Sequence, residues 1–318
     1  MNKEPLISII IPTYNREKCL LDTLHSLLAQ PYQNFEIVVI DQSETISEEK
    51  KLLIKKETKR IRYFQINERG RSLAKNYGIL QAKGELILFC DDDILVEANF
   101  LNTHIAIYER DPKIAAASCR LVEEGDPSEP IEGPLRTTGY GKLVNKPWST
   151  RSGYVSSLNG GNMSFKKEVL TKVGFFEEYF EGTSMVEEPD MAYRVIKSGY
   201  KVYFSADTTV QHFPQYNGNV AYMKEKRAEW FYFYFYNLLI FYTKYKRTIN
   251  LPIVFVYALL VCSKHIIIYG MAISGYTKMF KGFFGGIKKG GLIYKIEKAS
   301  PYFTNCRSPK LKITHLNG

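Results

Sequence analysis

The chain has 318 residues, with 45% hydrophobic and 24% charged side chains, an ordinary composition for a globular protein. Its five cysteines show no C-x-x-C spacing, which argues against a disulfide framework or a zinc knuckle and fits a reducing compartment. The formal net charge of +10 is uneven, because residues 221–318 contain 16 Lys or Arg but only 3 Asp or Glu. We therefore expect a near-neutral domain over residues 1–220 and a basic region over residues 221–318.

Strand and helix patterns alternate along the first 220 residues. Residues 1–5 are short and polar, so we expect no secretory signal. Short runs predict strands at residues 6–11, 35–40, 61–65, 85–89, 114–120, 163–165 and 200–204. The apolar runs at 6–11 and 35–40 suit buried strands of a parallel sheet. Periodic segments predict helices at residues 15–30, 47–59, 72–81, 99–110, 167–173 and 187–197. The alternation predicts an α/β fold with a mostly parallel sheet flanked by helices.

Residues 122–152 interrupt this alternation. They are rich in Gly, Pro, Ser and charged residues, so we expect a long irregular insertion. Loops of this length are commonly functional or disordered. If the insertion is functional, we expect it to meet the second substrate.

An apolar run ends abruptly in Asp91, Asp92 and Asp93. Three like charges at a strand end repel one another and resist burial, so a cation is expected to offset them. A divalent metal carrying a nucleotide diphosphate is one explanation, and a solvated acidic turn is the other. Thr13 and Asp41 also fall at the carboxyl ends of predicted strands, which is the edge where α/β sheets bind ligands.

Motifs in a fixed order make the chain resemble the family 2 glycosyltransferases. They are residues 8–15 (SIIIPTYN), Asp41, residues 70–78 (GRSLAKNYG), residues 91–93 (DDD), residues 160–168 (GGNMSFKKE) and residues 186–194 (VEEPDMAYR). The resemblance covers roughly residues 5–245 and implies the GT-A fold, with a basic, aromatic helical extension after it. It also implies a nucleotide-sugar half over residues 1–120 and an acceptor half over residues 121–220.

The function implied by this resemblance is an inverting, metal-dependent transfer of one sugar. The donor would be a UDP- or dTDP-sugar and the acceptor a hydroxyl of a glycan or lipid-linked molecule, in cell-surface polysaccharide or glycolipid assembly. Processive members of the family carry Q-x-x-R-W. Residues 224–230 (KEKRAEW) lack the Gln, which favours transfer of a single sugar over polymer synthesis.

The resemblance assigns a metal site and a nucleotide-sugar site. Asp93 would contact Mn²⁺ or Mg²⁺ directly, because hard oxygen ligands suit these ions, and Asp91 would face the ribose or a metal-bound water. Asp92 would point to the opposite face and be solvated if strand alternation continues. His212 either reaches the metal or diphosphate or is structural. The expected nucleotide-sugar site comprises Pro12, Thr13, Asn15, Asp41, Arg71, Lys75, Asp91, Asp92, Gly161 and Asn162.

Several of these residues have a second, structural interpretation. Asp41 accepts the N3–H of uracil or thymine, or is a turn residue. Asn15 contacts the nucleotide or caps the following helix. Arg71 and Lys75 contact the diphosphate or are solvated on a helix. Residues 160–162 let the backbone approach a substrate closely, or form a turn before a strand.

Glu188 is the expected general base. It occupies the position of the family's usual Asp and is one methylene longer, so its carboxylate must lie differently. Glu187 is the alternative base. Pro189 and Asp190 resemble a helix start, because Pro and acidic residues are favoured in a first turn, so we expect Asp190 to be structural.

The basic region contains 21 of the 44 aromatic residues, including seven in succession at residues 230–236. Two apolar runs, 251–262 and 266–273, are separated by Lys264 and His265, and neither reaches the ~20 residues that span a bilayer. We therefore expect buried or interfacial helices. Residues 278–289 mix Lys with Phe, which suits an anionic leaflet. The expected location is cytoplasmic and peripheral, on the inner face of the cell membrane, with no nucleic-acid partner.

Two other functions are consistent with parts of the pattern. A nucleotidyltransferase shares the α/β core but needs a Gly-rich, Lys- or Arg-containing loop directly after the first strand, and residues 12–15 (PTYN) are not such a loop. A non-catalytic membrane or nucleic-acid binding module would depend on the basic region alone.

Overall fold

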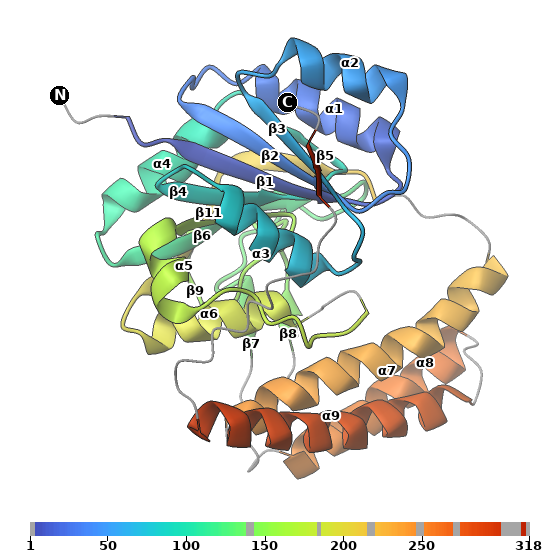
Figure 1. Ribbon diagram of the computed structural model, residues 1–318. Coiled ribbons are helices and arrows are strands. Elements are labelled where there is room, and N and C mark those ends of the chain that lie inside the picture. Colours follow the sequence, from blue (N-terminus) through green and yellow to red (C-terminus); the bar gives the residue numbers. More distant parts are fainter. Residues whose placement is uncertain are drawn as a thin grey trace.

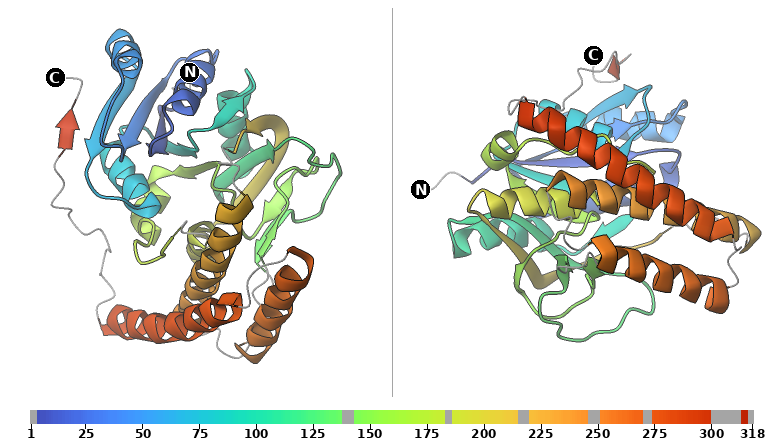
Figure 2. Two further views of the ribbon diagram at one scale, coloured as in Figure 1. Left: turned by 90° about the vertical axis from the view of Figure 1, so that its right-hand side faces the viewer. Right: turned by 90° about the horizontal axis from the view of Figure 1, so that it is seen from below.

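The computed structural model describes residues 4–137, 143–182, 186–214, 220–245, 251–269, 274–299 and 313–315. A large twisted sheet has helices on both faces, and three further helices lie together at one end of the molecule (Figures 1 and 2). The strand order in the sheet is β12-β3-β2-β1-β4-β10-β6-β11-β5. This arrangement confirms the expected α/β class.

The first half of the sheet is parallel. Its elements are β1 (Ile7–Thr13), α1 (Glu17–Leu28), β2 (Phe35–Asp41), α2 (Glu48–Lys56), β3 (Ile61–Ile66), α3 (Arg71–Gln81) and β4 (Leu86–Cys90). In the β1–β2 register Thr13 is paired with Asp41, and Ile10 is paired with Phe89 of β4. The carboxyl ends of these strands therefore meet at one edge, which we call the carboxyl edge.

The second half is mixed. It contains β5 (Ile94–Val96), α4 (Phe100–Arg110), β6 (Ile114–Val122), β10 (Asn162–Lys166), α5 (Lys167–Val173), α6 (Glu187–Lys197) and β11 (Lys201–His212). β10 is antiparallel to both β4 and β6, whereas β11 is parallel to β6. β11 is also antiparallel to β5, with His212 opposite Ile94. This register brings His212 to the carboxyl edge, beside the end of the aspartate run.

Five short strands, β5 and four others, were not expected from the sequence. β7 (Leu135–Thr137) and β8 (Leu143–Asn145) pair within the insertion, and β9 (Gly153–Val155) pairs with β11. β12 (Ile313–His315) is antiparallel to β3 at the edge of the sheet. Each has three residues, too few for a periodic pattern to appear, so the expectation of a wholly irregular insertion was wrong.

The core occupies both faces of the sheet. α1, α2 and α4 cover one face, where they pack on alternate strand residues such as Ile9 and Val39. α3, α5 and α6 cover the other face, where they pack on Ile10 and Val38. Each such side chain, once fully buried, contributes about 1.5–3 kcal/mol. Burial on both faces explains why these strands are continuous apolar runs.

The three additional helices are α7 (Val220–Lys244), α8 (Leu251–Tyr269) and α9 (Ser274–Ala299). Glycines recur every fourth residue on the face of α9 that meets α7. A Cβ atom at Gly282, Gly286 or Gly290 would overlap or crowd α7 backbone carbonyl oxygens, those of Tyr232, Tyr236 and Ile240 respectively. Small residues at this spacing let two helices approach closely. The glycines of α9 are therefore a packing feature.

α8 differs from its sequence interpretation. The two apolar runs form one helix that continues through Lys264 and His265; residues 270–273 lie outside the described residues. Leu251–Ile268 is long and apolar enough to cross a membrane, although a core helix can pass the same test. Only 17% of that segment is buried. The described structure therefore does not support a buried core helix, and the interfacial alternative remains.

Candidate active site

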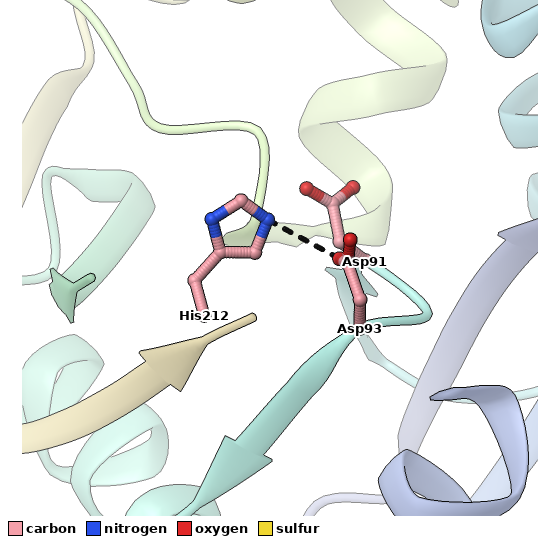
Figure 3. A group of neighbouring side chains, drawn as sticks. All are labelled: Asp91, Asp93 and His212. Carbon is pink, nitrogen blue, oxygen red and sulfur yellow. Dashed lines mark ion pairs between the residues drawn. The ribbon is translucent and has the colours of Figure 1, made fainter. Parts of the chain in front are cut away.

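Asp91, Asp93 and His212 lie together at the carboxyl edge (Figure 3). The two aspartates lie in the turn between β4 and β5, and His212 is the last residue of β11. One potential ligand atom from each residue lies within 4.8 Å of the others, and His212 Nε2 is 3.2 Å from Asp93 Oδ1. The structure thus brings together the three residues expected at the metal site.

The three side chains fit a divalent cation. Asp93 is buried, and its Oδ1 receives no aligned hydrogen bond from the part of the chain that the structure describes. Burial raises the pKa of Asp91, but the charges of Arg71, Lys75 and His212 outweigh burial and hold this pKa below its ordinary value. Two carboxylates and one imidazole nitrogen are a suitable donor set for a hard or borderline divalent metal.

Arg16 supplies positive charge that the sequence did not indicate. It precedes α1, and its Nη1 is 2.5 Å from Asp93 Oδ2 and 3.3 Å from Asp92 Oδ1. Part of the expected cationic compensation therefore comes from the chain itself. The only local signal is a basic residue directly after the loop that ends β1.

Asp92 is not solvated as expected. It is 5% exposed, and its Oδ2 accepts a 2.6 Å hydrogen bond from Thr13 Oγ1. Burial raises the pKa of Asp92 to about 6, although the hydrogen bond from Thr13 and the charge of Arg16 oppose this increase. The expectation failed because β4 ends at Cys90, so strand alternation does not continue through the aspartates.

Glu123 orients His212. Its Oε1 lies 2.8 Å from His212 Nδ1, leaving Nε2 directed at Asp93. Burial lowers the pKa of His212, but the contacts with Asp93 and Glu123 and the charge of Asp91 raise it to about 9. A carboxylate behind a ligating histidine commonly fixes its ring. Glu123 was not singled out, because it lies at the start of the insertion, where the sequence shows no pattern.

Asp41 lies at the end of β2 and is completely buried. Its Oδ2 accepts hydrogen bonds from Lys50 Nζ at 2.6 Å and Tyr63 Oη at 2.5 Å, and its Oδ1 accepts one from the Ser43 amide at 2.7 Å. The chain therefore provides this carboxylate with three donors. Its expected contact with a pyrimidine base stays a prediction, and it would require neighbouring atoms to move, because Asp41 is completely buried.

A surface hollow of about 430 Å³ adjoins Asp41. It is lined by Gln42, Ser43, Glu44, Gln65, Ile66, Asn67 and Arg69. The Arg69 guanidinium lies over the ring of Tyr14, 4.6 Å from its centre. The hollow therefore joins the ends of β2 and β3 to the loop after β1.

Replacing Lys50 by Met is expected to reduce the free energy of unfolding by about 3 kcal/mol, because it leaves the Asp41 carboxylate buried without its cation. Urea denaturation followed by circular dichroism measures this change. Lys51→Met is the matched control, since Lys51 pairs with the exposed Glu48 and should change stability by less than about 0.5 kcal/mol. Equal effects of the two substitutions would contradict the assignment.

Glu187 and Lys75 form a buried pair. Lys75 Nζ donates to Glu187 Oε1 at 2.5 Å, and Ser72 Oγ donates to Glu187 Oε2 at 2.6 Å. The Lys75 ammonium also lies 5.1 Å from the centre of the Phe176 ring. Because Lys75 is 1% exposed, it is not solvated on its helix, and its expected contact with the diphosphate stays a prediction. Both carboxylate oxygens of Glu187, the alternative base, therefore already accept hydrogen bonds from Ser72 and Lys75.

Glu188 is half-buried in the first turn of α6, against Gly160. A Cβ atom at Gly160 would overlap Glu188 Oε1, so the glycine makes room for the longer carboxylate. Burial, and then the negative charge of Glu187, raise the pKa of Glu188 to about 7, while Lys75 and Arg71 oppose the shift. A pKa near the working pH suits a general base.

Arg71 begins α3, and its pKa is influenced by the charges of both the metal group and the base. The negative charge of Asp91 is the largest influence on Arg71 and raises its pKa; partial desolvation by the surrounding atoms opposes the shift, and Glu187 and Glu188 reinforce it. Arg71 is exposed, unlike Lys75, so it is available to an anionic ligand. The carboxylates of the metal group and of α6 therefore act on the same cation.

The remaining expected residues make contacts within the chain, and their expected roles at the nucleotide-sugar site stay predictions. The Asp91 amide donates to the Gly161 carbonyl at 3.1 Å, and a Cβ atom at Gly161 would approach Asp91 Oδ2 to 3.4 Å. Asn162 exchanges two hydrogen bonds with the backbone of Cys119. Pro12 and Thr13 end β1, next to Asp41.

Asn15 has a φ of 54° in the loop after β1. Its amide donates to Ser43 Oγ at 2.7 Å. The capping position of α1 is Arg16, and no side-chain hydrogen bond caps the helix. Asn15 therefore does not cap α1.

Comparison with known proteins gives a consistent result. A sequence model described as "Glycosyl transferase family 2" matches residues 8–173. Poly-beta-1,6-N-acetyl-D-glucosamine synthase of Staphylococcus aureus (strain COL) is 25% identical over 217 residues, 64% of this chain and 50% of the relative. An uncharacterized glycosyltransferase of Rickettsia bellii is 33% identical over 145 residues, 45% of this chain and 21% of the relative. The chain thus spans half or less of the length of these relatives.

Solved structures share the fold. The mannosyltransferase PcManGT from Pyrobaculum calidifontis, in complex with GDP-Man and Mn²⁺, has a TM-score of 0.54 at 18% identity, covering 95% of this chain and 89% of its own. S. aureus TarS 1-349 has a TM-score of 0.58 at 15% identity, covering 90% and 82%. These likenesses confirm the expected GT-A fold.

The family match covers more than half of the chain, and it includes β1 to β4, the aspartate run and the Gly160–Asn162 turn. It favours a glycosyltransferase over the nucleotidyltransferase and the non-catalytic binding module. The chain belongs to glycosyl transferase family 2.

Proposed function

We propose that the protein transfers one sugar, with inversion, from a UDP- or dTDP-sugar to a hydroxyl of a glycan or lipid-linked acceptor. The observation that carries this proposal is that Asp91 of the metal group and Glu188 of α6 lie against two adjacent residues, Gly161 and Gly160 respectively. A nucleotide diphosphate bound there would have metal ligands on one side and a base on the other.

Asp91, Asp93 and His212 would hold Mn²⁺ or Mg²⁺, and the nitrogen ligand favours Mn²⁺. When bound, the metal stabilises negative charge on the departing diphosphate. Arg71 pairs with the same diphosphate. Glu188 accepts the proton of the acceptor hydroxyl as its oxygen bonds to the anomeric carbon and the bond to the nucleoside diphosphate breaks. A single displacement inverts the anomeric configuration.

Thermal stabilisation by candidate donors tests this function, because a ligand that binds only the native state raises its melting temperature. UDP-N-acetylglucosamine is the first choice, since the S. aureus relative is named as an N-acetylglucosamine polymer synthase. dTDP-glucose and GDP-mannose complete the panel, each with Mn²⁺ or with EDTA. We expect Mn²⁺-dependent stabilisation by a UDP- or dTDP-sugar. Stabilisation by GDP-mannose alone would contradict the base preference.

The exposed faces of α8 and α9 support a membrane surface as a second partner. On α8, exposed apolar residues recur at helical spacing: Ile253, Val256, Leu260 and Ile267 are 54–80% exposed. On α9, the exposed face carries Lys281, Phe284, Lys288, Lys289, Leu292 and Lys295. An exposed apolar stripe on one helix and exposed lysines on another fit the interface of an anionic leaflet.

Replacing Lys281, Lys288 and Lys289 by Gln is expected to weaken binding to liposomes containing phosphatidylglycerol by roughly 100-fold, since each lysine near the surface contributes about 1 kcal/mol. Co-sedimentation measures the binding. Lys55, Lys56 and Lys59 are exposed at the end of α2, on the opposite side of the molecule (Figure 1), and replacing them is the control.

Two results would change this assignment. Binding that ignores the anionic lipid content would contradict the lysine face. A chain that only detergent extracts from membranes would indicate that α8 crosses the bilayer instead.

A further inference from the structure

α7 holds the segment that leads into α6. The side-chain amide of Asn237 is completely buried and pairs with the backbone of Glu181, accepting from its N–H at 3.0 Å and donating to its carbonyl at 2.9 Å. The ring of Phe233 lies where a Cβ atom of Gly182 would be, and Gly182 has a φ of 65°. The Asn237 side chain thus satisfies both backbone groups of Glu181, as a neighbouring strand would in a sheet.

A second set of contacts joins the end of α7 to the first turn of α6. Lys244 Nζ donates to Glu177 Oε1 at 2.5 Å and lies 3.7 Å from Asp190 Oδ1. Tyr245 Oη donates to the same Asp190 oxygen at 2.8 Å. The other Asp190 oxygen accepts from Arg194 Nε at 2.9 Å. Asp190 is fully buried, so α7 and α6 share one buried carboxylate.

These contacts bracket the base. Asp190 is two residues after Glu188 in the first turn of α6. On the other side, Glu187 is fixed by Ser72 and Lys75 of α3. The turn that presents Glu188 is therefore held between α3 and α7. α3 belongs to the nucleotide-sugar half, whereas α7 belongs to the basic helical region.

We propose that Asn237 and Lys244 of α7, with Tyr245 directly after it, are positioning residues, which hold the first turn of α6 so that the Glu188 carboxylate lies against Gly160. This inference rests on the proposed role of Glu188. It makes the first helix of the basic region part of the catalytic unit. α7 then has two roles, because the glycine face of α9 packs against it as well.

These contacts should matter for catalysis because proton transfer is sensitive to the position of the base. A base must lie within roughly 2.6–3.2 Å of the proton it accepts, and a displacement of about 1 Å can cost up to 100-fold in rate. The position of Glu188 depends on the first turn of α6. Residues of α7, which lie outside the family match, restrain this turn from one side. Losing one of these hydrogen bonds should loosen the turn without unfolding the helix.

Tyr245→Phe is the first test, because it removes a single oxygen atom from the Asp190 contact. Tyr276→Phe is the matched control: Tyr276 Oη shares a 2.7 Å hydrogen bond with Ser263 between α9 and α8, away from α6. The readout is the titration of Glu188, followed by carbon-13 NMR of glutamate-labelled protein. Glu188→Gln identifies the resonance, since its signal disappears. This readout needs no donor or acceptor.

We expect Tyr245→Phe to lower the pKa of Glu188 by about one unit, because a loosened turn exposes the carboxylate to water. The charged groups around Glu188, namely Glu187, Lys75 and Arg71, are unchanged in this variant. Hydrolysis of UDP-N-acetylglucosamine with Mn²⁺ should show an about tenfold lower kcat at unchanged KM. Lys244→Met should lower the pKa of Glu188 and kcat in the same direction. Lys244→Arg keeps the positive charge and should retain most of the wild-type pKa and kcat.

Wild-type titration of Glu188 in both Tyr245→Phe and Lys244→Met would overturn the proposal. An equal shift in Tyr276→Phe would overturn it too, because it would indicate general loosening. A different result would contradict the proposed function. If Glu188→Gln retains transfer, Glu188 is not the base, while the NMR titration still reports whether α7 positions it.

Discussion

Replacing Glu188 by Gln is expected to reduce sugar transfer about 1000-fold, while Mn²⁺ and UDP still bind. A positioned general base contributes roughly 100- to 10,000-fold to a rate, and the amide cannot accept the proton. The Glu188 carboxylate lies against Gly160, whereas the metal group is formed by residues of β11 and of the turn after β4. Steady-state kinetics with the donor identified by thermal shift, together with calorimetric titration of UDP, separates the two effects.

The pH dependence of the wild-type protein provides a second readout. Burial and the charge of Glu187 raise the pKa of Glu188 to about 7. The base works only when deprotonated, so log kcat/KM should rise with unit slope up to about pH 7 and level off above it. Glu188→Gln should lose this limb of the profile. An unchanged limb in the variant would mean that another group titrates.

The contribution of Glu188 to the free energy of unfolding should fall as pH rises, whereas kcat/KM rises. A carboxyl whose folded-state pKa is raised favours its protonated form, so folding is penalised progressively as pH rises from about 4.5 to about 7. Glu188→Gln removes this penalty and should raise the free energy of unfolding more at pH 8 than at pH 4. Glu124→Gln, an exposed substitution in the insertion, should alter neither rate nor stability.

The carboxyl edge could be predicted because it follows from strand patterns alone. Parallel strands end at a common edge, so apolar runs that stop at Thr13, Asp41 and Asp91 bring these residues together. His212 joined them because β11 runs parallel to β6 and ends beside β5. Here the order of elements determined the site.

Contacts between distant residues could not be predicted. Arg16 reaches Asp93 across 77 residues, and Glu123 reaches His212 across 89. Lys75 looked like a solvated helical residue, since its partner Glu187 is 112 residues away. No local periodicity encodes such pairs, because each depends on how loops return to the edge.

The length of α8 was misjudged for a different reason. Lys264 was treated as an interruption, which it would be at the centre of a bilayer. In the structure it is exposed on the side of a continuous helix, in the same stripe as Leu260 and Ile267. A long lysine side chain can place its charge in water while its stem covers apolar surface. The charge therefore limits where the helix lies and does not end it.

Replacing Asp93 by Asn is expected to weaken Mn²⁺ binding on the order of 100-fold and to abolish sugar transfer. Asp93 Oδ1 is buried beside His212 without an aligned hydrogen bond among the described residues, so its negative charge is available to a cation. An amide oxygen at this position keeps the shape and loses the charge. Calorimetric titration with Mn²⁺ in the presence of UDP measures the affinity.

Asp92→Asn is the matched control, one residue away with the same change of charge. The oxygens of Asp92 face Thr13 and Arg16, so this variant should retain Mn²⁺ binding and lose part of its thermal stability. In Asp93→Asn, Arg16 keeps Asp92 as a partner, so the fold should persist while Mn²⁺-dependent stabilisation disappears. Equal loss of Mn²⁺ binding in both variants would mean that the aspartate run acts through its total charge. Loss in Asp93→Asn alone follows from the geometry, because β4 ends before the aspartates and the turn directs neighbouring carboxylates to different partners.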